Sequence, residues 1–326
     1  MSSPTLVAEQ EVQQNDSWNY LGAPKGFIVP PLHPGGVQLK PLQLAEGVYA
    51  LLSNTGVVDN NGFIVGERGV LVIDAHINGV MAQQIIDAVE QVTSKPILYL
   101  VNTNYHGDHT FGNYKFPLTT TVIAHRETAQ QMQYFERAKL LMLQAVRGDE
   151  SVLSDVKLRL PDMVIDRSIR IDLGGRAVEL RHLGGGNTNG DVVVYEPDSR
   201  VAWTGNLVIG AGTIPGMFQN GAVTYLNTLT NLRSTLDVET IVPGHGAITD
   251  RTTLTRYLQY AGELTDTVRA ARRAGRTIDQ VLEETPLWVQ YLPPADSPLA
   301  AFTPVLQGFH RMNLLKTYQE EAARRP

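Results

Sequence analysis

The sequence predicts an α/β protein in which two β-sheets are sandwiched between helices. Short β-rich runs bounded by tight turns occur in both halves of the chain, and apolar residues at helical spacing flank them. Halves that are both strand-rich and flanked by helices fit two sheets between two helical layers. With 326 residues and 43% hydrophobic content, the chain can bury the large core of one such domain.

The residues before 41 are predicted to form an arm and not part of either sheet. Residues 22–36 are rich in proline and glycine, which exclude a regular helix and a central strand. Such an arm would lie over the body of the protein or onto the second subunit of a homodimer. The single catalytic domain is then expected to span residues 41–326.

The elements of this domain follow from apolar periodicity and turn residues. Strands are predicted at residues 47–52, 62–65 and 70–73, and a helix at 78–92, where Val80, Ile85, Ile86, Val89 and Val92 stand at helical spacing. Residues 97–101 form a buried apolar strand. A strand and a helix are predicted within 121–145, further strands at 163–171, 177–182, 191–196 and 200–204, and mostly helix from residue 250 onward.

The segment from Asn102 to Asn113 directly follows an apolar strand and concentrates potential metal ligands. It contains His106, Asp108 and His109 within one short loop, and a further imidazole, His245, stands in a distant Pro-Gly-His-Gly turn. Mixed nitrogen and oxygen donors suit Zn²⁺ better than Ca²⁺ or Mg²⁺. Since the chain has no cysteine, nitrogen and oxygen ligands must hold any metal.

Charge and hydropathy exclude several classes of partner. The formal net charge is -6 and no block of lysine or arginine stands out, so the footprint of a nucleic-acid or anionic-membrane binder is missing. The first 17 residues lack the basic and apolar parts of a signal peptide, and no apolar run reaches the roughly 18 residues of a membrane span. We therefore expect a cytoplasmic protein that acts on small molecules.

Five separated motifs resemble those of metallo-β-lactamase-fold hydrolases. They are Asp74 after a strand, the 104–109 loop, the glycine-rich turn at 184–191, the segment 204–206 and the turn at 243–246. The resemblance covers residues 41–250 and implies a four-layer αββα sandwich with metal in a cleft along one edge of the sheets. A helical extension would follow, and Asp74 would fix a loop instead of binding metal.

The resemblance also implies which metal ligands are lost. Asn104 and Asn187 stand where the dinuclear pattern of the family has histidines, and Asn206 stands where it has an aspartate that bridges two metals. One metal position would keep only His106 and is predicted to be empty. The ligands predicted for a single catalytic Zn²⁺ per chain are Asp108, His109, Asn206 and His245, and for Asn206 a role that only orients the site stays open.

Within the family, this ligand set resembles that of the chlorothalonil hydrolytic dehalogenases, a mononuclear variant. The resemblance implies replacement of a ring chlorine by hydroxyl, with a metal-bound hydroxide as the nucleophile. His106, released from metal binding, is predicted to act as the base. Asp108 is predicted to be a catalytic residue as well as a ligand.

The uncharged stretch 207–224 is predicted to form an apolar wall over the metal, which suits a small neutral aromatic or apolar substrate. Substrate contacts are predicted for Tyr105, Asn187, Met217 and Phe218. An ester, thioester or lactone hydrolase is the alternative that keeps the zinc. Two histidines and one carboxylate are also the ligands of non-haem Fe(II) oxygenases, so that class stays open, as does a scaffold without metal or catalysis.

Overall fold

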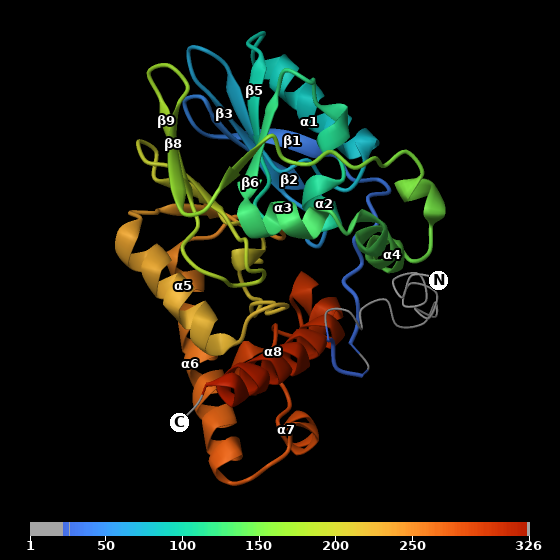
Figure 1. The fold of residues 1–326 in the computed structure, drawn as a ribbon, viewed down its shortest axis with the longest axis vertical. Coiled ribbons are helices and arrows are strands. Elements are labelled where there is room, and N and C mark those ends of the chain that lie inside the picture. Colours follow the sequence, from blue (N-terminus) through green and yellow to red (C-terminus); the bar gives the residue numbers. More distant parts are fainter. Residues whose placement is uncertain (1–21, 26, 325–326) are drawn as a thin grey trace, which may run out of the picture.

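Two stacked β-sheets form the centre of the computed structural model, which describes residues 22–25 and 27–324 (Figure 1). In spatial order, the first sheet contains β1 (Leu39–Ala45), β2 (Val48–Ser53), β3 (Asn61–Val65), β4 (Val70–Ile73), β5 (Ile97–Val101), β6 (Thr121–His125) and β7 (Met163–Ile165). The second sheet contains β12 (Thr240–Val242), β11 (Val201–Trp203), β10 (Val193–Glu196), β9 (Ala177–Arg181) and β8 (Ser168–Asp172). Strands β4 to β7 are parallel to one another, and so are β11 and β12.

The central strands are continuous apolar runs because both of their faces are covered. In β4, Val70 and Val72 belong to the core under the outer helices, whereas Leu71 and Ile73 belong to the core between the sheets. Trp203 of β11 packs against the backbone of β3, where a Cβ atom on Gly62 would lie only 2.2 Å from the indole nitrogen. A glycine at this position therefore allows the two sheets to approach.

Helices cover both outer faces and complete the predicted four-layer αββα sandwich. Helices α1 (Gly79–Val92) and α4 (Phe135–Ala145) pack on the first sheet, and α5 (Ala222–Thr235) and α6 (Arg251–Arg273) pack on the second. The other α-helices are α2 (Gly107–Thr110), α3 (Arg126–Met132), α7 (Ile278–Glu284) and α8 (Thr303–Ala323). Figure 1 shows α6, α7 and α8 as the helical extension expected after residue 250.

Helix α1 confirms the helix predicted at 78–92, but its buried face differs from the predicted one. Met81, Ile85 and Val89 are buried, whereas Val80 is 67% exposed. Asn78 caps the helix by accepting the backbone N–H of Met81.

The described part of the N-terminal arm lies over its own chain. The backbone N–H of Leu32 donates to the carbonyl of Ala145 at 2.9 Å, and Phe27 stacks on Phe309 of α8 with ring centroids 6.1 Å apart. Strand β1 begins at Leu39, so the boundary predicted at residue 40 falls inside the first strand. Residues 1–21 of the predicted arm lie outside the described residues.

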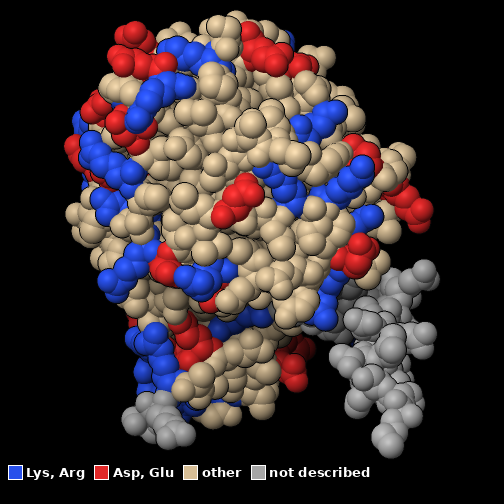
Figure 2. Space-filling view, turned by 45° about the horizontal axis from the view of Figure 1, so that its top comes forward, with Lys and Arg blue, Asp and Glu red and all other residues tan. Residues whose placement is uncertain are grey.

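None of the described helices is a candidate membrane span, and one face of the molecule carries charges of both signs. In the described part of the chain, no helix is both long and apolar enough to cross a bilayer. On the face shown in Figure 2, basic and acidic side chains are interspersed among uncharged ones.

Candidate metal centre

Four loops meet at one edge of the two sheets. The loop after β5 enters α2, β11 leads to Asn206, and β12 leads to His245. The loop between β2 and β3 reaches the same edge, because β3 runs antiparallel to β4 and begins where β4 ends. In open α/β sheets, the carboxyl ends of parallel strands are a common place for ligand sites.

The loop after β5 is fixed by a pair of buried amides. Asn102 and Asn113 exchange two side-chain hydrogen bonds, of 3.0 and 2.8 Å, and neither residue is exposed. This pair holds the two ends of the loop together. Asp108 and His109 consequently lie in the first turn of α2, where both are buried.

Two glycines allow the neighbouring loops to touch. Gly205 has a φ of +50°, and a Cβ atom there would lie 2.3 Å from the hydroxyl oxygen of Thr103. A Cβ atom on Gly244 would lie 2.6 Å from the side-chain oxygen of Asn206. Larger residues at either position would push Asn206 away from the loop after β5 or from the turn of His245.

Four acceptor atoms converge where these loops meet. His109 Nε2 lies 3.1 Å from Asn206 Oδ1 and 3.8 Å from Asp108 Oδ2. His245 Nε2 lies 3.5 Å from the same oxygen of Asp108. All four residues are less than 10% exposed.

The hydrogen bonds on the far side of each imidazole decide which nitrogen is left free. His109 Nδ1 lies 2.8 Å from a carboxylate oxygen of Asp74, and His245 Nδ1 lies 2.8 Å from the carbonyl oxygen of Val57. In neutral rings these contacts require the proton on Nδ1 and leave a lone pair on Nε2. Buried lone pairs that face one another repel unless a proton or a metal ion lies between them, so this set of nitrogen and oxygen donors fits a metal ion.

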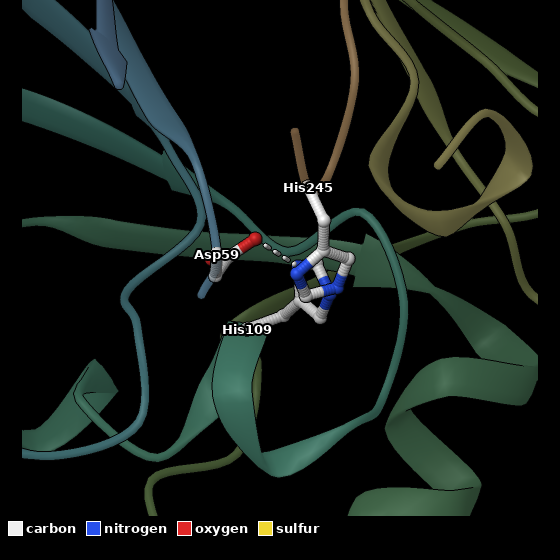
Figure 3. A group of neighbouring side chains, drawn as sticks. All are labelled: Asp59, His109 and His245. Atoms are coloured by element: carbon white, nitrogen blue, oxygen red, sulfur yellow. Dashed lines mark ion pairs between the residues drawn. The ribbon is translucent and has the colours of Figure 1, made fainter. Parts of the chain in front are cut away.

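Two further buried carboxylates lie behind His109. Asp74 accepts both the backbone N–H and the hydroxyl of Thr103 at 2.7 Å, so it fixes a loop as the sequence predicted. Asp59 was not predicted, and its Oδ1 lies 3.4 Å from His109 Nδ1. In Figure 3, Asp59, His109 and His245 come together, and one ligand atom of each lies within 4.8 Å of the others.

Burial and charge act on the imidazoles in different directions. Burial lowers the pKa of His245 to about 4 and that of His106 to about 4, which keeps both rings neutral near pH 7. Burial acts in the same sense on His109, but the negative charges of Asp59, Asp74 and Asp108 outweigh it and raise its pKa well above the usual value. The field that holds a proton on His109 would also favour a metal cation.

His106 lies beside the converging atoms and does not belong to them. Its Nδ1 lies 3.1 Å from the amide nitrogen of Asn206, and its backbone N–H donates to the side chain of Asn104 at 2.8 Å. Its Nε2 is buried and has no hydrogen-bond partner in the described residues. Asn206 therefore faces His109 with its oxygen and His106 with its nitrogen.

A cavity of about 400 Å³ opens onto this centre, and its walls are mostly apolar. The arm contributes Pro30, α4 contributes Leu141 and Met142, and the C-terminal region contributes Phe302 and Phe309. In the described part of the chain, no lysine or arginine lines the cavity. The chemistry of the walls favours a neutral ligand over an anionic one.

The predicted substrate-binding residues do not all reach this cavity. Tyr105, Asn187 and Phe218 line it, and the ring of Phe218 lies 5.7 Å from that of His106. Met217 does not line the cavity, because it is fully buried in the core beneath the second sheet. Its placement gives no support to a contact with substrate.

Asn313, a buried residue of α8, holds the part of the predicted uncharged stretch that precedes Phe218. Asn313 accepts the backbone N–H of Met217 at 2.8 Å and donates to the carbonyl of Pro215 at 2.7 Å. It also donates to the hydroxyl of Tyr260 at 3.1 Å. Through these bonds, the C-terminal extension positions Phe218 at the mouth of the metal centre.

Comparison with known proteins gives a match over the region that carries the centre. The family model described as the Metallo-beta-lactamase superfamily matches residues 54–245. Among solved structures, the DIM-1 metallo-beta-lactamase is 16% identical with a TM-score of 0.56, and the match covers 70% of this chain and 99% of that one. A metallo-beta-lactamase from Pontibacter korlensis is 17% identical with a TM-score of 0.54, covering 69% of this chain and 99% of that one.

A longer match extends into the C-terminal helices. The inverting sec-alkylsulfatase Pisa1 from Pseudomonas sp. is 17% identical with a TM-score of 0.64, and the match covers 86% of this chain but only 50% of that one. At these identities, the structural matches establish a shared fold.

Proposed function

Because this chain belongs to the metallo-β-lactamase superfamily, we propose that it is a hydrolase with one Zn²⁺ held by Asp108, His109, Asn206 and His245. The observation that carries the proposal is the convergence of four buried acceptor atoms from these residues. A zinc ion with an open position lowers the pKa of a bound water toward about 7 and so supplies a nucleophile near neutral pH.

The alternative third ligand, Asp59, faces the other side of His109. Its oxygen approaches Nδ1, which Asp74 already contacts, whereas an oxygen of Asp108 approaches Nε2 of both histidines. We therefore assign Asp108 to the metal and Asp59 to an outer position, where its charge would support the ligand His109.

We propose a chlorinated aromatic such as chlorothalonil as the substrate, with a ring C–Cl bond replaced by C–OH. Water supplies the hydroxyl group, and one proton and one chloride ion are released. Chloride leaves without protonation, so no strong general acid is needed. Phe218 lines the cavity beside His106 and would give a flat neutral substrate an aromatic contact.

A neutral ester, thioester or lactone is the second candidate, because the same uncharged cavity would accept it. An alkyl sulfate, the substrate class in the name of one structural neighbour, would bring an anionic group into a cavity whose described lining has no lysine or arginine. We therefore favour neutral substrates.

Zinc-loaded protein is expected to release chloride from chlorothalonil at a rate above that of the metal-free protein. An ion-selective electrode measures the chloride, and the hydrolysis of p-nitrophenyl acetate is followed in parallel. Ester hydrolysis without chloride release would support the second candidate. The absence of both activities in protein shown to hold zinc would contradict the assignment of either substrate class.

Replacing Asn313 by alanine is expected to weaken substrate binding without loss of zinc. The change removes three buried hydrogen bonds, so we expect a loss of about 1–3 kcal/mol in the free energy of unfolding and a several-fold increase in KM. Chemical denaturation, elemental analysis and steady-state kinetics measure the three quantities. An unchanged KM would show that the wall does not depend on this residue.

A further inference from the structure

The loop between β2 and β3 is built against the turn that carries His245. Asp59 forms a backbone bridge with His245, and the ring of His245 donates to the carbonyl of Val57 at 2.8 Å. The backbone N–H of Asn60 donates to the carbonyl of Gly244 at 2.7 Å. The turn at 243–246, which follows β12 of the second sheet, is thus held by the loop between β2 and β3 of the first sheet.

Asn60 supplies the side-chain part of this attachment. Its amide nitrogen donates to the carbonyls of Pro243, at 3.1 Å, and Gly246, at 2.8 Å, which lie on either side of His245. Its side-chain oxygen accepts the backbone N–H of Ser53 at 3.0 Å and so ties the turn to the end of β2. Asn60 is 3% exposed, and both the donor and the acceptor groups of its side chain are used.

The turn needs such an attachment because glycines flank its histidine. Gly246 has a φ of +77°, and Gly244 lacks a side chain so that Asn206 can approach. Glycine has the greatest backbone freedom of any residue, so a Gly-His-Gly segment does not by itself fix the direction in which the imidazole of His245 points. The bonds from Asn60 fix the backbone on both sides of that ring.

We propose that Asn60 is a positioning residue of the metal centre, which fixes the turn at 243–246 so that His245 Nε2 points toward Asp108. The inference rests on the proposed role of His245 as a ligand. The three side-chain hydrogen bonds of Asn60 described above go to backbone groups, so its effect on metal binding would be exerted through the position of His245. Outer partners of metal ligands typically change metal affinity by about 10- to 100-fold when they are replaced.

The test measures zinc affinity of the full chain by competition with a chromophoric chelator. Asn60→Asp keeps the shape and an acceptor for Ser53 but loses both donors and brings a carboxylate against two carbonyl oxygens. We expect zinc to bind about 10- to 100-fold more weakly to this variant. Asn60→Ser keeps one donor and is expected to fall between Asn60→Asp and the unmodified protein.

Asn313→Ala is the matched control, because it also removes a buried asparagine with three side-chain hydrogen bonds but lies away from the turn. Its zinc affinity should stay within about twofold of the unmodified protein. The Co²⁺ absorption spectrum should change in the Asn60 variants and stay the same in the control.

The outcomes separate this inference from the proposed function. If the unmodified protein binds no zinc, the proposed function fails. If it binds zinc and folded Asn60→Asp binds zinc equally well, only the positioning role is overturned. Should Asn60→Asp not fold, the same affinity in Asn60→Ser as in the unmodified protein would overturn the role.

Discussion

Replacing Asp108 by asparagine is expected to weaken zinc binding more than about 100-fold and to reduce turnover to that of the metal-free protein. The change removes the anionic member of the proposed ligand set, whose oxygen lies 3.8 Å from His109 Nε2 and 3.5 Å from His245 Nε2. Because outer partners of metal ligands account for about 10- to 100-fold in affinity, loss of a direct ligand should exceed that range.

Asp59→Asn is the matched variant, since both aspartates are buried and both lie near His109. As an outer carboxylate, Asp59 should affect zinc affinity by no more than about 100-fold. Chelator competition and elemental analysis give the affinity and the number of ions per chain. If Asp59→Asn lost the metal while Asp108→Asn kept it, the ligand set would instead be Asp59, His109 and His245.

Elements with strong periodicity could be predicted from the sequence, and those stabilised by distant parts of the chain could not. Strands β4 and β5 match the predicted ranges, because each is a short apolar run covered on both faces. Helix α5 was missed because its sequence contains four threonines, which favour helix poorly. Its first turn is held by Glu320 of α8, which accepts the backbone N–H groups of Val223 and Thr224 at 3.0 Å each.

The predicted ligands could be found because their residue types and spacing are specific, whereas their outer partners are ordinary polar residues. The structure brings Asp108, His109, Asn206 and His245 together, although their roles in metal binding stay a prediction. The run Asp-Asn-Asn at 59–61, before an apolar strand, was a possible signal. The structural role of this run depends on a turn more than 180 residues away, as the hydrogen bond from Asn60 to Pro243 shows.

The cavity was only partly predictable for a similar reason. The uncharged stretch indicated a wall, and Phe218 lies in it. The neighbouring residue Met217, however, is buried in the core and does not line the cavity. The contributions of Pro30 from the arm and Phe309 from α8 come from opposite ends of the chain. No local pattern in either segment indicates that they share a pocket.

Replacing His106 by alanine is expected to lower kcat by about 100-fold or more while zinc content stays at the level of the unmodified protein. The residue lines the cavity, its Nδ1 contacts Asn206, and its Nε2 has no hydrogen-bond partner among the described residues. General acid–base groups contribute about 10²- to 10⁴-fold to turnover. Elemental analysis and steady-state kinetics on the same preparation separate loss of metal from loss of proton transfer.

His106→Gln tests whether the residue accepts a proton, as the base role requires. The amide of Asn206 lies at Nδ1, and a neutral ring that accepts this hydrogen bond carries its own proton on Nε2. In that state the ring can donate a hydrogen bond, and it can serve as a base only if the bond from Asn206 is released. Glutamine can donate a hydrogen bond but cannot take up the proton, so a base predicts the same loss of kcat in His106→Gln as in His106→Ala. Substantial activity in His106→Gln would instead identify a hydrogen-bond donor to the substrate or the leaving group.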